Sequence, residues 1–129
     1  MLMVGLDVTL ETLITSEHLE LLKRHGKEEN RAVIEFMDQS LQHYFHFYRE
    51  ANYIMNAAPM HDPLAMMAAL HPDLLTCRQM KVRVEHQGEH TSGMVVADLR
   101  AQPKVGEYIE IAVGVDARRA VGIFLSAFM

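Results

Sequence analysis

The feature that most constrains the fold is a long run of apolar residues at helical spacing in the middle of the chain. Over residues 30–53 the apolar side chains recur every three or four positions. They are Val33, Met37, Leu41, Tyr44, Phe45 and Tyr48. This spacing places them on one face of an α-helix, so the sequence predicts one long amphipathic helix over this range.

Strand-like segments lie on both sides of this helix. Residues 1–6 are an apolar run typical of a buried strand. In residues 80–86 valines alternate with charged residues, residues 87–89 contain a glycine that favours a turn, and residues 94–99 are apolar enough to pair back. Residues 107–115 form a further strand pattern. We therefore expect a β-hairpin over residues 80–99 and a partial sheet.

Shorter helices complete the expected arrangement. Residues 10–13 and 16–24 indicate a short helical region with Ser16 as its N-cap and His25-Gly26 as its end. Residues 117–128 predict an amphipathic helix at the end of the chain. Strands and helices together predict an α/β fold in a single domain, with helices packed around the sheet.

The string Pro59-Met60-His61-Asp62-Pro63-Leu64-Ala65 carries the most chemistry, because it places an imidazole and a carboxylate at the start of a predicted helix. Asp62 could ligate a hard cation such as calcium, and His61 could pass a proton to a leaving group. The alternative is an Asp62 N-cap before Pro63 with an exposed His61. Spacing alone favours that alternative, because calcium takes about 6–8 oxygen ligands.

Charge and cysteine content limit the classes of partner. The net charge is −5 and the 12 Lys and Arg residues are scattered, so no surface for nucleic acid is predicted. The apolar start of the chain is too short for a membrane span and lacks the basic start of a signal peptide. Cys77 is the only cysteine, which favours a reducing, cytoplasmic setting. A small molecule or another protein is the expected partner.

Three strings occur in an order and at a spacing that together carry a family resemblance. They are Gly5-Leu6-Asp7-Val8-Thr9, then Pro59-Met60-His61-Asp62-Pro63-Leu64-Ala65, then Thr91-Ser92-Gly93-Met94-Val95-Val96-Ala97-Asp98. In this respect the chain resembles the C-terminal part of the inosine-uridine type of nucleoside hydrolases. The fold that the resemblance implies is an open, mostly parallel sheet with a hairpin and flanking helices.

The resemblance also implies site residues, a cofactor and a substrate. His61 would activate the leaving base, and Asp62 would complete the shell of a calcium ion. The helix before this motif would contact the base, with Tyr53 and Arg49 as candidate substrate-binding residues. The implied substrate is a ribonucleoside, whose N-glycosidic bond is cleaved to give ribose and a free base.

The sequence departs from the family pattern at its start. Family members open with an aspartate-rich string of the form D-T-D-x-G-x-D-D, which supplies most of the calcium ligands, and these 129 residues contain no such string. We therefore expect residues 1–129 to form a partial domain that is inactive or weakly active by itself. It would form homo-oligomers or associate with a missing N-terminal half. The alternative function is a non-catalytic binding or assembly module.

Overall fold

Helices and strands alternate along the chain, and the computed structural model describes all 129 residues. The predicted α/β class is confirmed. The elements are β1 (Leu2–Met3), α1 (Leu6–Thr9), β2 (Leu13–Thr15), α2 (Ser16–His25), η1 (Glu28–Asn30), α3 (Arg31–Asn52), β3 (Ala57–Pro59), α4 (His61–Leu70), η2 (Pro72–Leu74), β4 (Leu75–Val84), β5 (Val95–Ala97), β6 (Glu107–Val115) and α5 (Ala117–Ser126).

The main sheet has four strands in the order β1-β6-β4-β5. The predicted hairpin is confirmed, because β4 and β5 pair antiparallel with Val82 opposite Ala97. β4 also pairs antiparallel with β6, whereas β1 and β6 are parallel. The strands of this chain thus form a mixed, open sheet that contains the expected hairpin. β4 lies at the centre and pairs with both strands that follow it, and connections without a crossover helix favour antiparallel pairing.

The long helix is confirmed as α3, which spans Arg31–Asn52. Its last turn ends at Tyr53, whose φ of 57° is left-handed and stops the helix. Two predictions before it are wrong. Residues 10–13 are not helical, because residues 10–11 form a turn and Leu13 begins the strand β2 (Leu13–Thr15). The N-cap of α2 is Thr15 rather than Ser16. Thr15 and His18 form a reciprocal capping box that fixes the start of α2 one residue earlier.

A second, two-stranded sheet connects the long helix to the site. β2 and β3 pair antiparallel, with Ile14 opposite Ala58. The backbone N–H of Met60 donates to the carbonyl of Thr12 at 2.8 Å, which continues this pairing up to the start of α4. Residues 57–59 form β3 and are buried, although no strand was predicted there. The small side chains of Ala57 and Ala58 allow this close packing.

The main hydrophobic core lies between the helices and the start of the sheet. Its buried residues are Val8, Ile14, Leu19, Phe45, Ala58, Met60, Leu64, Met67, Leu74, Ala112 and Ala120. They come from all five α-helices, the small sheet, β6 and η2, and Met60 lies between β3 and α4. The strand predicted at residues 1–6 shrinks to β1 at the edge of the sheet, and it is not buried, because Leu2 is 38% exposed.

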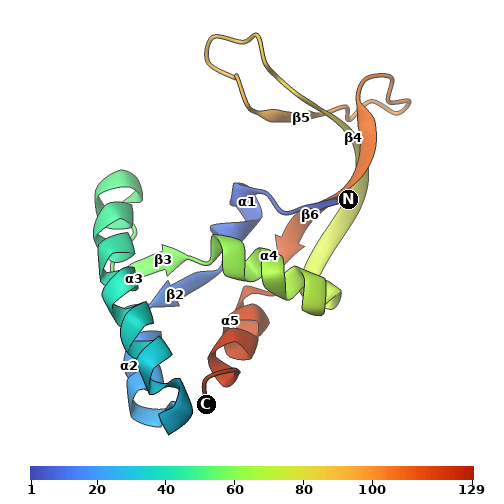
Figure 1. Cartoon of the computed structure of the whole chain (residues 1–129). Helices are drawn as coiled ribbons and strands as arrows, with labels where there is room; N and C mark the ends of the chain where they lie inside the picture. Colours follow the sequence, from blue (N-terminus) through green and yellow to red (C-terminus); the bar gives the residue numbers. More distant parts are fainter.

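The molecule extends away from this core in one direction. β4 and β6 run from the helices to the far end, where β5 and the two loops beside it project (Figure 1). The five helices lie at the opposite end, with α4 in front of the start of the sheet (Figure 1). None of the helices combines the length and the apolar character needed to cross a bilayer.

Candidate active site

The candidate site lies where β3 passes into α4. α4 begins at His61, and its N-cap residue Met60 offers no side-chain hydrogen bond. The interpretation of Asp62 as the N-cap is therefore wrong, because the helix starts one residue before it. Pairing with Thr12 holds the backbone of Met60, whose carbonyl then accepts the first helical hydrogen bond, from Leu64. Asp62 lies in the first turn, where a carboxylate interacts favourably with the helix dipole.

Both ring nitrogens of His61 have partners from distant parts of the chain. Nδ1 lies 2.6 Å from the Thr9 hydroxyl of α1, and Nε2 lies 2.7 Å from the Tyr48 hydroxyl of α3. These are normal hydrogen-bond distances, so α1, α3 and α4 meet at this imidazole. The side chain has a defined orientation instead of extending freely into solvent.

Aromatic side chains of α3 surround the hydroxyl that reaches His61. The ring of Tyr48 packs edge-on against Phe47 at a centroid distance of 5.2 Å and stacks with Tyr44 at 6.4 Å. Tyr48 is half-buried against the core. Such packing limits the movement of the tyrosine, so its hydroxyl is held near the imidazole.

A cavity of about 330 Å³ opens beside His61 and Asp62. α3 contributes Phe36, Ser40 and Tyr44 to its wall, and residues 58–63 form the opposite side. The volume is at the lower end of the range of about 300–1,000 Å³ for small-molecule sites. An aromatic and mostly apolar wall next to an imidazole and a carboxylate suits a flat polar ring.

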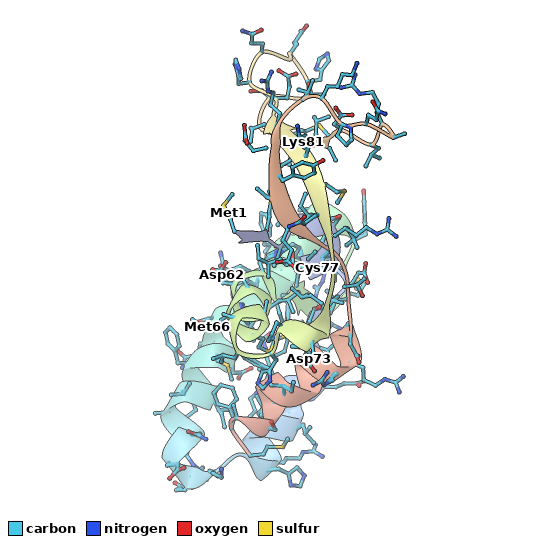
Figure 2. The ribbon with its side chains drawn as sticks, turned by 90° about the vertical axis from the view of Figure 1, so that its right-hand side faces the viewer. Met1, Asp62, Met66, Asp73, Cys77 and Lys81 are labelled. Carbon is cyan, nitrogen blue, oxygen red and sulfur yellow. The ribbon has the colours of Figure 1, made fainter.

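Asp62 is exposed and forms no hydrogen bond or salt bridge with another side chain. Figure 2 shows it on the same side of α4 as Met66. A calcium ion requires about 6–8 oxygen ligands. Nowhere in the chain do three or more His, Cys, Asp or Glu side chains converge as a possible metal site. Asp62 is free to supply one ligand.

The two candidate substrate-binding residues lie at the end of α3. Arg49 donates from Nη2 to the Asn56 side-chain oxygen at 2.9 Å, and Tyr53 is 89% exposed. Neither lines the cavity beside His61. The structure therefore brings His61 and Asp62 together at one cavity. Arg49 and Tyr53 lie outside it, at the C-terminal end of α3.

Thr9 and Tyr48 are site residues that the sequence did not single out. Thr9 ends the string Gly5-Leu6-Asp7-Val8-Thr9, and Tyr48 belongs to the apolar pattern of the long helix. The Thr9 hydroxyl contacts His61 from 52 residues away in the sequence, and the Tyr48 hydroxyl from 13 residues away. Thr9 lies within a motif and Tyr48 lies in the helix before one, but only the fold shows that both hydroxyls contact His61.

Cys77 does not belong to the chemistry of the site. Burial raises the pKa of its thiol, and the negative charge of Glu110 adds to the rise. A thiol with a raised pKa stays protonated near neutral pH and is a poor nucleophile. Cysteine-based catalysis is therefore not supported.

Comparisons with known proteins agree with this arrangement. Residues 1–121 match the family described as inosine-uridine preferring nucleoside hydrolase. The chain belongs to this nucleoside hydrolase family. It is 34% identical to an inosine-uridine preferring nucleoside hydrolase of Crithidia fasciculata over 125 residues, which are 97% of this chain and 38% of the relative. It is also 34% identical over 96 residues to the pyrimidine-specific ribonucleoside hydrolase RihA of Citrobacter koseri, covering 74% of this chain and 30% of that protein.

The fold agrees with solved nucleoside hydrolase structures. A plant nucleoside hydrolase, the PpNRh1 enzyme, superimposes with a TM-score of 0.81 at 26% sequence identity, covering 97% of this chain and 40% of that one. The match falls on the C-terminal part of the family members. This nucleoside hydrolase chain thus spans about two fifths of the length of such relatives.

Proposed function

We propose that the chain takes part in ribonucleoside hydrolysis, the cleavage of an N-glycosidic bond to give ribose and a free base. The observation that carries this proposal is the His61-Asp62 pair at a cavity whose wall is largely apolar and aromatic. Membership of the nucleoside hydrolase family supports it. The cavity is suited to a flat base, and the imidazole beside it is suited to proton transfer.

The proposed role of His61 follows from the charges that develop during the reaction. The ribose carbon gains positive charge as the bond to the base nitrogen breaks, and the electron pair of that bond goes to the base. Water adds its oxygen to the ribose carbon and releases a proton to the solvent, and the solvent returns a proton to His61 after each turnover. His61 transfers a proton to the departing base, which leaves as a neutral molecule.

The proposed role of Asp62 is to supply one carboxylate ligand to calcium. Its exposure and its lack of a partner inside the chain support this role. A bound calcium would activate the attacking water as a Lewis acid. The remaining ligands would have to come from other polypeptide, since this chain offers no cluster of further carboxylates at the site.

Arg49 and Tyr53 are the proposed contacts to the base, because they lie at the end of the same helix whose Tyr44 lines the cavity. Tyr53 has no packing role at 89% exposure, so its ring is available for stacking. The relatives bear names that differ in base preference, inosine-uridine in one and pyrimidine-specific in the other. Both base classes therefore belong in the test.

The test measures ribose released from inosine and from uridine in the presence of calcium. The chain is assayed alone and after co-expression with the segment of the Crithidia fasciculata relative that precedes the matched part. We expect little or no turnover by the chain alone and calcium-dependent turnover by the complex. His61→Ala abolishes this turnover, whereas His71→Ala, at the opposite end of α4, keeps it and serves as the matched control.

Each other outcome has a distinct meaning. Turnover that persists in His61→Ala contradicts the proton-transfer role. Turnover that is unchanged by a calcium chelator contradicts the role of Asp62. A complex that assembles with the wild-type chain but hydrolyses neither nucleoside contradicts the hydrolase proposal and favours a non-catalytic assembly module.

Exposed apolar surface favours that assembly function as the second candidate. On α4, Met66 is 64% exposed and Leu70 is 68% exposed, and on α3 Phe36 is 68% exposed. Apolar surface of this kind marks contact with another polypeptide. We propose the complementary part of a nucleoside hydrolase fold as the occupant, with a second copy of this chain as the competing outcome. Light scattering of the chain with and without the Crithidia segment distinguishes a 1:1 complex from a homo-oligomer.

A further inference from the structure

The hydrogen bonds around His61 form one continuous chain with a defined end. The Thr9 hydroxyl oxygen lies 3.3 Å from the Leu6 carbonyl and 2.6 Å from His61 Nδ1. On the other side of the ring, Nε2 lies 2.7 Å from the Tyr48 hydroxyl. The series therefore runs from the Leu6 carbonyl through Thr9 and His61 to Tyr48.

The Leu6 carbonyl favours one direction of this series, because a carbonyl can only accept; it also accepts the backbone N–H of Leu10 at 2.9 Å. Thr9 has a single hydroxyl proton, and at 3% exposure it is shielded from water. If that proton pointed to His61, the Thr9 and Leu6 oxygens would face each other with no hydrogen between them. If Thr9 donates to Leu6, its oxygen accepts the proton on Nδ1, and no repulsive pair arises.

The remaining bonds follow from this direction. A neutral imidazole carries one proton, so a ring that donates from Nδ1 has a bare Nε2. Tyr48 is then the donor, and its O–H points at Nε2. Every group in this series of hydrogen bonds has a compatible partner in this arrangement.

We propose that Thr9 is a positioning residue that sets the tautomer of His61, with the proton on Nδ1 and with Nε2 facing the Tyr48 hydroxyl. The significance for catalysis rests on the proposed hydrolase function. In that function Nε2 first takes up a proton, which makes His61 an imidazolium, and it then donates this proton to the base. Tyr48 is the hydroxyl that Nε2 contacts before substrate arrives. Thr9 acts only through His61.

The test is a nitrogen–proton correlation spectrum of the histidine rings in the full chain, recorded in alkaline buffer so that the imidazoles are neutral. The ring nitrogen shifts and the couplings to the ring carbons' protons distinguish the two tautomers. A His61→Gln variant identifies the signal of His61 among the eight histidines. The variants are Thr9→Val, Thr9→Ser and Tyr48→Phe.

Thr12→Val is the matched control for Thr9→Val. Thr12 is also a buried threonine near α1, at 0% exposure, and its hydroxyl has no hydrogen-bond partner. The substitution makes the same chemical change three residues away from Thr9 without touching the proposed series. It therefore reports any general effect of a buried threonine-to-valine change on the spectrum.

We expect wild type, Thr9→Ser and Thr12→Val to show the proton on Nδ1. Thr9→Val shifts His61 toward the Nε2-protonated form, and Tyr48→Phe moves the Nε2 resonance while the proton stays on Nδ1. An Nε2-protonated wild-type ring overturns the proposal even if no variant folds, as does an unchanged spectrum in folded Thr9→Val. Because the spectrum needs no turnover, failure of the hydrolysis assay leaves this result standing.

Discussion

The two ends of the molecule are held in different ways. At the end that carries His61, apolar side chains are removed from water, and Leu64 in α4 is 0% exposed. At the far end of the sheet, apolar side chains remain in contact with solvent. Val84 is 54% exposed, Val96 is 53% exposed and Leu99 is 80% exposed. The stability of the site end thus depends on burial. The far end, residues 82–107, must be stabilised by other interactions.

Carboxylates that accept backbone hydrogen bonds hold the far end. Asp98 accepts from the backbone N–H of Lys104 at 2.8 Å and of Val105 at 3.1 Å, and it pairs with the Arg100 guanidinium. Glu85 accepts from the backbone N–H of Gln87 at 2.7 Å. Local hydrogen bonds of this kind shape loops without requiring a core. The comparison teaches that burial stabilises the site end, whereas local hydrogen bonds to carboxylates shape the loops at the far end.

The strongest test of the comparison removes the same side chain at each end. Leu64→Ala leaves a cavity in the core and should lower the free energy of unfolding by about 2–5 kcal/mol. Leu99→Ala, at 80% exposure, should change it by less than about 0.5 kcal/mol. Urea unfolding followed by circular dichroism measures both. Similar losses for the two variants would show that the far end packs against a core after all.

Two glycines give a second test, because the far end contains a position whose backbone conformation favours glycine. Gly106 has a φ of +95°, and an added Cβ would lie 2.2 Å from the Val82 carbonyl oxygen. Gly106→Ala should lower the free energy of unfolding by about 1–3 kcal/mol through backbone strain. Gly122→Ala in α5 meets nothing within 4 Å and should stabilise the chain by about 0.5–1 kcal/mol. Thermal unfolding of the two variants should give shifts of opposite sign.

Acid should weaken the hydrogen bonds that Asp98 accepts at the far end. The Arg100 guanidinium beside Asp98, together with the backbone N–H donors, holds the pKa of that carboxyl well below its ordinary range. Because the folded-state pKa is lowered, this stabilisation is complete above the unfolded-state value of about 3.9 and is lost as the pH falls through the lower folded value. Amide hydrogen exchange of Lys104 and Val105 should therefore accelerate in strong acid relative to the general pH trend.

Asp98→Asn separates the charge from the shape of this side chain. The amide keeps one oxygen acceptor but loses the charge that pairs with Arg100, so protection of Lys104 and Val105 should fall at neutral pH. Protection of the Leu64 amide, which belongs to the core, should not change. Equal loss at Leu64 would mean that the two ends are one cooperative unit.

Periodic and bounded segments of the fold were predictable from the sequence. α3, the β4–β5 hairpin and β6 all followed from apolar spacing, because each buries or pairs one face over many residues. β2 and β3 were missed, since three residues are too few for a period to appear and both depend on each other for hydrogen bonds. The predicted start of α4 was also wrong, because a backbone hydrogen bond between Met60 and Thr12 determines it.

The candidate site was predictable only in part. The motif string led to His61 and Asp62, and the structure places both at the start of α4 beside one cavity. It could not lead to Thr9 and Tyr48, because their hydroxyls reach the imidazole from α1 and α3, and this meeting point exists only after the helices pack. The assignment of roles to Arg49 and Tyr53 stays a prediction.

The smallest change in the free energy of unfolding is expected within the site end. It tests whether burial alone stabilises this end. Thr12 is fully buried, yet its hydroxyl has no partner, so it bears a cost of desolvation without a compensating hydrogen bond. Thr12→Val should raise the free energy of unfolding by about 1 kcal/mol, measured by urea titration. Thr9→Val should lower it, because Thr9 bonds both Leu6 and His61. A loss of stability in Thr12→Val would reveal a bound water on that hydroxyl, and polar satisfaction would then hold this end together as well as burial does.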